Sequence, residues 1–323
     1  VRGFTNAAGN VLINGQRPSV KQDTPAQILG RIPATNVVRI ELIRGQTASI
    51  DLQGQQVVAN VVLREDSPTT GRWEAYVYDN THDDVIMPGG SVSLSSRWSG
   101  IDVNLGLGGN RHAHNSKGTR NSYAEDGSLL EDRSNNLLNK HLTLSANLNA
   151  SAWVGETLVQ VNTEVGYDEV HEWLVADRIP QDPDEPPFNE KIVDDREDNA
   201  LEFGVSAERD LRQAVTGKGI LILISDDSDE VSTQRVLDDN GDQTLFRFSD
   251  KSTDATEVIG RLEFDWTGFE HHHLQLNAEF AFNALEGGLF QTADRGTGPV
   301  VEDVPGANTR VEEDRFDVLL ADT

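Results

Sequence analysis

Hydrophobic and polar residues alternate with a period of two over most of the chain after Gly71. Successive side chains of a β-strand point to opposite faces, so this alternation predicts strands with one apolar and one polar face. Several runs are longer than the roughly 5–6 residues of a typical globular strand. They approach the roughly 9–11 residues with which a tilted strand crosses a bilayer. The clearest runs cover residues 101–107, 142–150, 159–168, 262–266 and 274–283.

The connections between these strands are alternately short and long, a pattern that is typical of transmembrane β-barrels. The short turns centre on residues 99–100, 153–156, 211–218 and 267–270. The long connections cover residues 79–90, 111–140, 177–199, 226–252 and 287–310. Aromatic residues near the predicted strand ends suit the girdle of such a barrel; they are Tyr76, Tyr78, Trp98, Trp153, Trp173, Trp266 and Phe269. Residues 71–323 therefore predict an antiparallel transmembrane β-barrel, incomplete, with about ten strands present.

The first 66 residues follow a different pattern. A strand at Val11–Ile13 runs into Asn14-Gly15, the residue pair that a type I′ hairpin turn prefers. Thr24-Pro25 then marks the start of a short helix that Pro33 ends. Two further strands are predicted at residues 37–43 and 57–63. Residues 1–66 are thus a small α+β domain, too short to build a large core alone. Neither end of the chain has the features of a natural terminus, so we expect it to be part of a longer protein.

Composition removes several functional classes. The net charge of −27 argues against nucleic acid as a partner, because no basic patch is available to neutralise phosphates. The absence of cysteine excludes disulfides, thiolate metal sites and a cysteine nucleophile. No apolar run approaches the roughly 18–20 residues of a transmembrane helix. Residues 106–109 resemble a glycine-rich nucleotide loop only superficially, because Arg111 occupies the last glycine position.

The sequence contains a few groups that could bind a metal or catalyse a reaction, but none in a pattern that indicates an enzyme. His112 and His114 can share a strand face, but we interpret them as part of a loop entrance, and the run at 271–273 as a polar rim. The acidic run at 238–242 fails the EF-hand pattern, because Gln243 stands where that loop requires glycine and Ser249 where it requires glutamate. Loose binding of divalent cations by the acidic loops stays open. We predict no metal site, no cofactor and no catalytic residues.

Three segments of the N-terminal domain, in this order, resemble the plug of a TonB-dependent outer-membrane receptor. The first is Arg2-Gly3-Phe4 with the strand that ends at Asn14-Gly15, the second is residues 38–45, and the third is residues 54–61. The resemblance covers the later part of a plug domain and the first part of a barrel. Gln55-Gln56 stands where the family usually has a second glycine. The residues that carry the plug motif are Arg2, Gly3, Asn14, Gly15, Arg39, Glu41, Arg44, Gly45, Gly54 and Asn60.

The resemblance implies energy-coupled uptake of a scarce solute across the bacterial outer membrane, gated by the plug. The solute would be a siderophore, a metal chelate, a vitamin or a glycan. The implied partners are a TonB-type periplasmic energy-transducing protein and the lipid and lipopolysaccharide of the outer membrane. The TonB-contacting segment is not in this sequence, and the ligand-binding residues are unassigned. The best candidates are the loops at 14–22 and 46–53 and the acidic barrel loops.

The plug arginines allow two interpretations. Arg39 and Arg44 can pair with inward-facing acids of the barrel such as Glu164, Glu263 or Glu279, or they can merely solubilise an edge strand. Two other functional classes also stay open: a passive porin or adhesin barrel, and a soluble carbohydrate-binding β-module.

Overall fold

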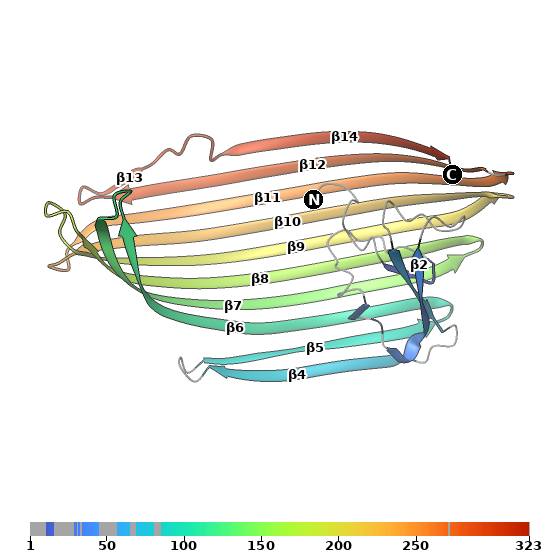
Figure 1. The fold of residues 1–323 in the computed structure, drawn as a ribbon, viewed down its shortest axis with the longest axis horizontal. Helices are drawn as coiled ribbons and strands as arrows, with labels where there is room; N and C mark the ends of the chain where they lie inside the picture. The colour runs from blue at the N-terminus through green and yellow to red at the C-terminus, as the bar shows by residue number, and fades with distance from the viewer. Residues whose placement is uncertain are drawn as a thin grey trace.

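The computed structural model describes residues 11–15, 29–30, 32, 34–44, 57–64, 69–80, 85–270 and 272–322. They form two sheets, a small one from residues 11–63 and a very large antiparallel one from residue 70 onward (Figure 1). This confirms the predicted mainly β class and an open sheet of the kind that a barrel fragment forms. Among the described residues, no helix is long and apolar enough to cross a membrane.

The large sheet is a meander of 11 strands in which each strand pairs with its neighbours in the sequence, except that β14 pairs with β12 beside the short β13. Its strands are β4 (Thr70–Asn80), β5 (Val85–Trp98), β6 (Ile101–Tyr123), β7 (Leu129–Val154), β8 (Thr157–Pro180), β9 (Phe188–Arg212), β10 (Val215–Asp238), β11 (Gln243–Phe269), β12 (His272–Asp294), β13 (Pro299–Val301) and β14 (Thr309–Asp322).

The predicted long loops are wrong, because most of those residues belong to strands. β6 and β7 continue to a short turn at 124–128, and β10 and β11 to one at 239–242. The strands consequently reach 23–27 residues, far beyond the apolar alternation. In these extensions both faces carry polar residues, such as Asp226, Asp227 and Ser228. The alternation of hydrophobic and polar residues that marks a strand is therefore absent there, although the backbones of neighbouring strands pair just as well.

The register gives the large sheet an inner face, which carries the small sheet, and an outer face. On β7 the outward residues from 142 to 152 are all apolar, whereas the inward ones include Thr143, Ser145, Asn147 and Asn149. The same holds on β12, where Leu276 and Phe280 point outward and are 42% and 45% exposed. We call this band the outer belt; it includes Val92, Leu94, Leu105, Leu107, Leu144, Leu148, Val165, Leu201, Leu221, Leu223, Leu262, Phe264, Leu276, Phe280, Phe316 and Val318.

The predicted aromatic girdle is confirmed only in part. Trp98 and Trp266 lie on the outer face at the short-turn end. Tyr76 instead lies on the inner face, where its ring covers Gly89 so closely that a Cβ at that position would lie 2.4 Å from it. Tyr78 follows on the same face, with ring centroids 5.1 Å apart, and Trp153 lines an inner cavity described below. Strand ends alone did not reveal which face an aromatic residue takes.

The small sheet has the order β1-β3-β2, with β1 (Val11–Ile13), β2 (Val37–Arg44) and β3 (Val57–Leu63), and a 3-10 turn η1 (Ala34–Asn36) precedes β2. Leu12 and Val58 form its core, against which Ile43 packs. The predicted strands at 37–43 and 57–63 are confirmed. The hairpin prediction for Val11–Gly15 is wrong in its pairing, because β1 runs parallel to β3. Most of the predicted helix lies outside the described residues.

The described residues of the inner face include an apolar patch. Ile222 and Ile259 are fully buried, and Ile224 and Ala281 are nearly so, with Ile220 packed against them. The run from 220 to 224 is therefore apolar on both faces, since Leu221 and Leu223 belong to the outer belt.

Truncating Ile222 to alanine should destabilise the fold by about 2–5 kcal/mol, because it leaves a void among packed side chains. Leu223→Ala, at the adjacent outward residue, should cost less than about 1 kcal/mol, because that side chain packs against little protein. Urea unfolding of both variants measures the difference. Equal losses at the two positions would contradict the assignment of faces.

Candidate functional site

The motif residues of the small sheet meet around Asn60, a buried residue of β3. Its Oδ1 accepts a hydrogen bond from the Gly15 backbone N–H at 2.7 Å, and its Nδ2 donates to Glu41 Oε2 at 2.9 Å. The other carboxylate oxygen of Glu41 pairs with Arg39 Nε at 2.7 Å. One asparagine side chain thus joins β1, β2 and β3. The hydrogen bonds from Arg39 and then from Asn60 hold the pKa of Glu41 below its usual value.

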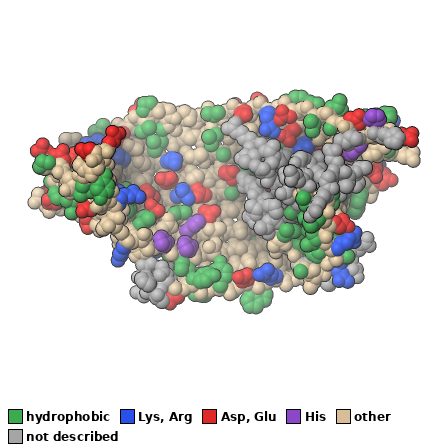
Figure 2. Space-filling view, in the orientation of Figure 1, with side chains coloured by type: hydrophobic (Ala, Val, Ile, Leu, Met, Phe, Trp, Pro, Cys, Tyr) green, Lys and Arg blue, Asp and Glu red, His purple; other side chains and the backbone are tan. Residues whose placement is uncertain are grey.

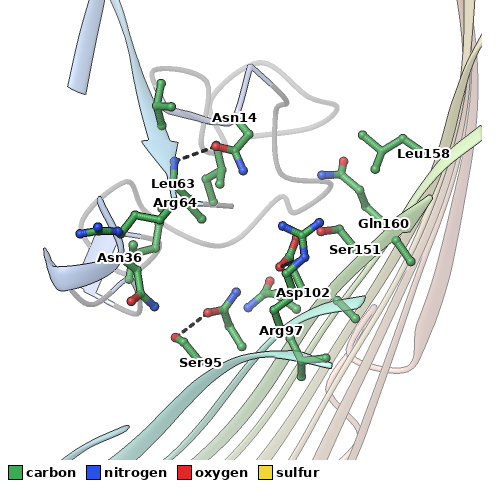
Figure 3. Close-up of a pocket in the computed structure, with 18 of the residues that line it drawn as sticks. Asn14, Asn36, Leu63, Arg64, Ser95, Arg97, Asp102, Ser151, Leu158 and Gln160 are labelled. Atoms are coloured by element: carbon green, nitrogen blue, oxygen red, sulfur yellow. Dashed lines mark hydrogen bonds and ion pairs between the residues drawn. The ribbon is translucent and has the colours of Figure 1, made fainter. Parts of the chain in front are cut away.

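Asn14 makes the turn that brings Gly15 to Asn60. Its φ is +51° and that of Gly15 is +82°, the left-handed values that Asn and Gly tolerate best. The Asn14 N–H donates to the Val61 carbonyl at 2.9 Å, and its Oδ1 accepts from the Leu63 N–H at 2.7 Å (Figure 3). The sequence indicated the positive φ values, but not that this side chain fastens the end of β3.

The other motif residues are placed less fully. Arg2, Gly3, Gly45 and Gly54 lie outside the described residues, and Arg44 is the last residue of β2, opposite Val57. The proposed pairing of Arg39 with barrel acids is not what the described residues show, since Arg39 pairs with Glu41. Within the large sheet, Glu263 and Glu279 pair with Arg261, at 2.8 and 3.8 Å, and Glu279 also with Arg315. The large sheet supplies those cations itself.

A cavity of about 590 Å³ lies between the small sheet and the inner face of the large one (Figure 3). Asn14, Asn36 and Asn60 contribute to one wall, and Arg97 and Asp102, 3.6 Å apart, to the other. Most of the remaining polar lining is uncharged: Ser95, Asn104, Asn149, Ser151, Gln160 and Asn162. Asn36 Nδ2 donates to Thr70 Oγ1 at 3.2 Å, which ties η1 to the first strand of the large sheet.

Two amides in this cavity are incompletely bonded. Asn162 is 6% exposed and its Nδ2 has no hydrogen-bond partner among the described residues. Asn36 is 5% exposed and its Oδ1 likewise has none there. A buried polar atom left without a partner costs about 1–3 kcal/mol. This is a cost that a bound molecule or water would remove.

At the end of the inner face opposite the small sheet, side chains form a continuous chain of ion pairs and hydrogen bonds, which we call the mouth network. Glu131 pairs with Arg178 at 2.8 Å, Arg178 with Glu190 at 3.3 Å, and Gln234 donates to Glu190 at 2.6 Å. Arg247 then donates to Gln234 at 2.7 Å and pairs with Glu302 at 3.2 Å. Gln291 and Arg295 complete the site around Glu302. The network thus connects side chains of all the adjacent strands from β7 to β12.

Glu302, at the end of the network, accepts hydrogen bonds from three side chains. Hydrogen bonds from Arg295, then from Gln291 and Arg247, lower its pKa from 4.5 to about 2. It follows β13, and its own N–H donates to the Gln291 carbonyl at 2.9 Å. The strand extension therefore folds back on itself at this point, and the acidic sequence gave no signal of it.

Histidines gather on the inner face over β6 and β7 (Figure 2). The register places His112 directly opposite His141, with His114 two residues along on the same face. His141 Nε2 lies 2.9 Å from Asp168 Oδ1, which also accepts from Thr143 at 2.7 Å. Within the described residues, no three His, Asp or Glu side chains are arranged to hold a metal ion. Sequence reasoning missed His141, because only strand pairing brings it to His112.

Comparisons with known proteins give fold-level likenesses only. No protein-family model matches the chain, and a search of curated proteins found no match. Among solved structures it resembles the ferric yersiniabactin uptake receptor FyuA of Yersinia pestis, at 12% identity and a TM-score of 0.31, over 96% of this chain and 52% of that one.

It also resembles the ferric citrate transporter FecA in its unliganded form, at 10% identity and a TM-score of 0.33, over 99% and 52% of the two chains. A third is the siderophore receptor PiuA of Acinetobacter baumannii, at 10% identity and a TM-score of 0.27, over 97% of this chain and 54% of that one. The chain thus spans about half the length of these structures.

Replacing Asn60 with alanine should destabilise the small sheet by about 1–3 kcal/mol, because it leaves the Gly15 N–H and the Glu41 carboxylate without their buried partner. Amide hydrogen exchange at Gly15 should accelerate. The Leu63 amide, bonded to Asn14, is an internal control and should change less. Equal acceleration at both amides would indicate loss of the whole sheet rather than of this junction.

Because the folded-state pKa of Glu302 is depressed, its stabilising contribution is present above about pH 4.5 and is lost as the pH falls towards 2. Glu302→Gln should therefore lower the midpoint of unfolding near neutral pH, and the difference from the native protein should vanish near pH 2. Unfolding midpoints from pH 2 to 7 test this. Asp303→Asn, which removes the neighbouring exposed carboxylate, is the control, and a difference that stays constant with pH would contradict the assignment.

Proposed function

We propose that this chain is part of a plugged outer-membrane transporter of the TonB-dependent type, in which residues 1–66 are the plug and the large sheet is part of the barrel wall. The observation that carries the proposal is the division of the large sheet into an apolar outer face and a polar inner face that carries the small sheet. A barrel wall in a membrane needs both properties at once.

The height of the outer belt supports a bilayer as its environment. Outward residues are apolar from 142 to 152 on β7 and from 274 to 284 on β12, matching the roughly 9–11 residues of a tilted spanning strand. The first outward position beyond the belt is charged on both strands, Lys140 on β7 and Glu286 on β12. An exposed apolar band this large is not expected on a soluble monomer.

The position of the small sheet supports a gating role. It stands on the polar face, separated from it by the cavity of about 590 Å³ and attached near its edge through Asn36 and Thr70. A domain held by polar contacts can move as a body, because each such contact contributes little net stability. A tightly packed apolar interface would resist that movement.

In this mechanism the solute is captured at the end of the mouth network and leaves past the small sheet on the short-turn side. A TonB-type periplasmic protein supplies the force that displaces the plug, and outer-membrane lipid and lipopolysaccharide surround the belt and the strand extensions. The solute is a small molecule; siderophore, metal chelate, vitamin and glycan all remain candidates. A passive porin would use the same wall but gives the small sheet no role.

Deleting residues 1–66 from the protein that carries this chain should convert a closed pore into an open one. The expected result in planar bilayers is a large, steady conductance that the intact protein lacks. The Leu223→Ala protein, which retains the domain intact, is the control and should stay closed. An intact protein that already conducts freely would exclude gating, and one that never enters the bilayer would exclude the membrane role.

A further inference from the structure

The cavity between the two sheets has the chemistry of a binding site for a neutral solute rich in hydroxyl groups. We propose that it binds a short oligosaccharide of two or three sugar units. We call it the amide cavity, after the side chains that line it from the large sheet and η1: Asn36, Asn104, Asn149, Ser151, Gln160 and Asn162. Its volume of about 590 Å³ lies within the roughly 300–1,000 Å³ of small-molecule sites.

Charge argues against an ionic ligand here. Arg39 is paired with Glu41 at 2.7 Å, and Arg97 with Asp102 at 3.6 Å, so these four charges compensate one another in pairs. Arg64 is the remaining charged side chain of the lining, and the other polar side chains are amides and hydroxyls. Each carboxamide offers donors at nitrogen and an acceptor at oxygen, and a sugar hydroxyl both donates and accepts. The match is therefore to neutral hydroxyl groups, although the protein as a whole carries a charge of −27.

The two incompletely bonded amides indicate what a ligand would have to supply. Asn162 Nδ2 needs an acceptor and Asn36 Oδ1 needs a donor, and both belong to side chains that are at least nine-tenths buried. Hydroxyl groups can meet both needs, whereas a carboxylate could satisfy only Asn162. Ser95 Oγ already donates to Asn104 Oδ1 at 2.6 Å, which fixes the orientation of the Asn104 amide in the lining.

Trp153 and Leu158 add an apolar surface to the lining. They flank the turn between β7 and β8, and Trp153 is 64% exposed. An indole face is a suitable platform for the apolar face of a sugar ring. Amides for the hydroxyls and one aromatic face for the ring carbons are a complete set of contacts for a saccharide, and a peptide would use the aromatic residue but leave most amides unmatched.

The amide cavity lies at the short-turn end of the large sheet, away from the mouth network. If the protein is the transporter proposed above, which this step of the inference assumes, the cavity is on the exit path of the solute. A neutral ligand that passes there needs weak and exchangeable contacts, and neutral amides provide such contacts.

The test is calorimetric titration of the full protein in detergent with maltotriose and cellotriose, with citrate and triglycine as competing chemistries. We expect at least one trisaccharide to bind, and citrate and triglycine not to. Asn162→Leu should weaken that binding at least tenfold. Asn277→Leu is the matched control, because Asn277 is equally buried, at 6% exposure, on the inner face of β12 but outside the cavity, and it should leave binding unchanged.

Trp153→Ala is a second test at an exposed residue, where truncation has little effect on stability, so a loss of binding cannot come from a folding defect. It should also weaken trisaccharide binding severalfold. Absence of binding by both trisaccharides, binding of citrate or triglycine instead, or equal effects of Asn162→Leu and Asn277→Leu would overturn the inference. The conductance of the protein without residues 1–66 is measured without sugar. A negative titration beside an opened pore therefore refutes this inference alone.

Discussion

The structure depends on one constraint, the antiparallel backbone ladder of the large sheet, which runs with almost no interruption from β4 to β12 and on to β14. Because each pair of strands keeps its register over nearly its full length, with shifts only near strand ends such as Val236/Leu237 and Val215/Thr216, every second side chain stays on the same face from one edge to the other. The outer belt, the inner cavity and the mouth network are all products of that register. A slip of one residue in β7 would turn Asn149 outward and Leu148 towards the amide cavity.

This dependence explains what the sequence could predict. Where one face is apolar and the other polar, as at Leu144 and Ser145, the alternation located the strand and distinguished its two faces. Where both faces are polar, as at Asp226 and Asp227, the same backbone ladder leaves no trace in the hydrophobicity pattern, and the strands were predicted as loops. Where both faces are apolar, as at Ile222 and Leu223, the pattern identified a strand but not the buried inner patch. Contrast between faces, rather than strand formation itself, is what a sequence reveals.

The candidate site shows the same limit at the level of single residues. Asn14 and Gly15 could be predicted as a turn, because few residues tolerate positive φ. That the Asn60 amide reaches the Gly15 N–H and Glu41 could not, because these contacts depend on β1 lying parallel to β3, and the local sequence favoured a hairpin. His112 and His141 are a further example, since residues far apart in the chain become neighbours only through register. Charges were the least predictable, because Arg261 and Arg315 pair with acids that the sequence offers equally to the plug arginines.

The two ends of the inner face differ in how their polar groups are compensated, and this difference bears on how such a wall can work. In the mouth network each arginine contacts a carboxylate or a glutamine, and Glu190 is almost fully buried. Removing one partner there would leave a buried charge, which is strongly unfavourable, so the network holds the strand extensions in a fixed arrangement. In the amide cavity most of the polar groups are neutral amides and hydroxyls, and exchanging one hydrogen-bond partner for water or a hydroxyl changes the free energy little. A rigid, charge-compensated mouth and an adaptable, mostly uncharged cavity would let a domain shift on the inner face without disturbing the strands that hold the wall together.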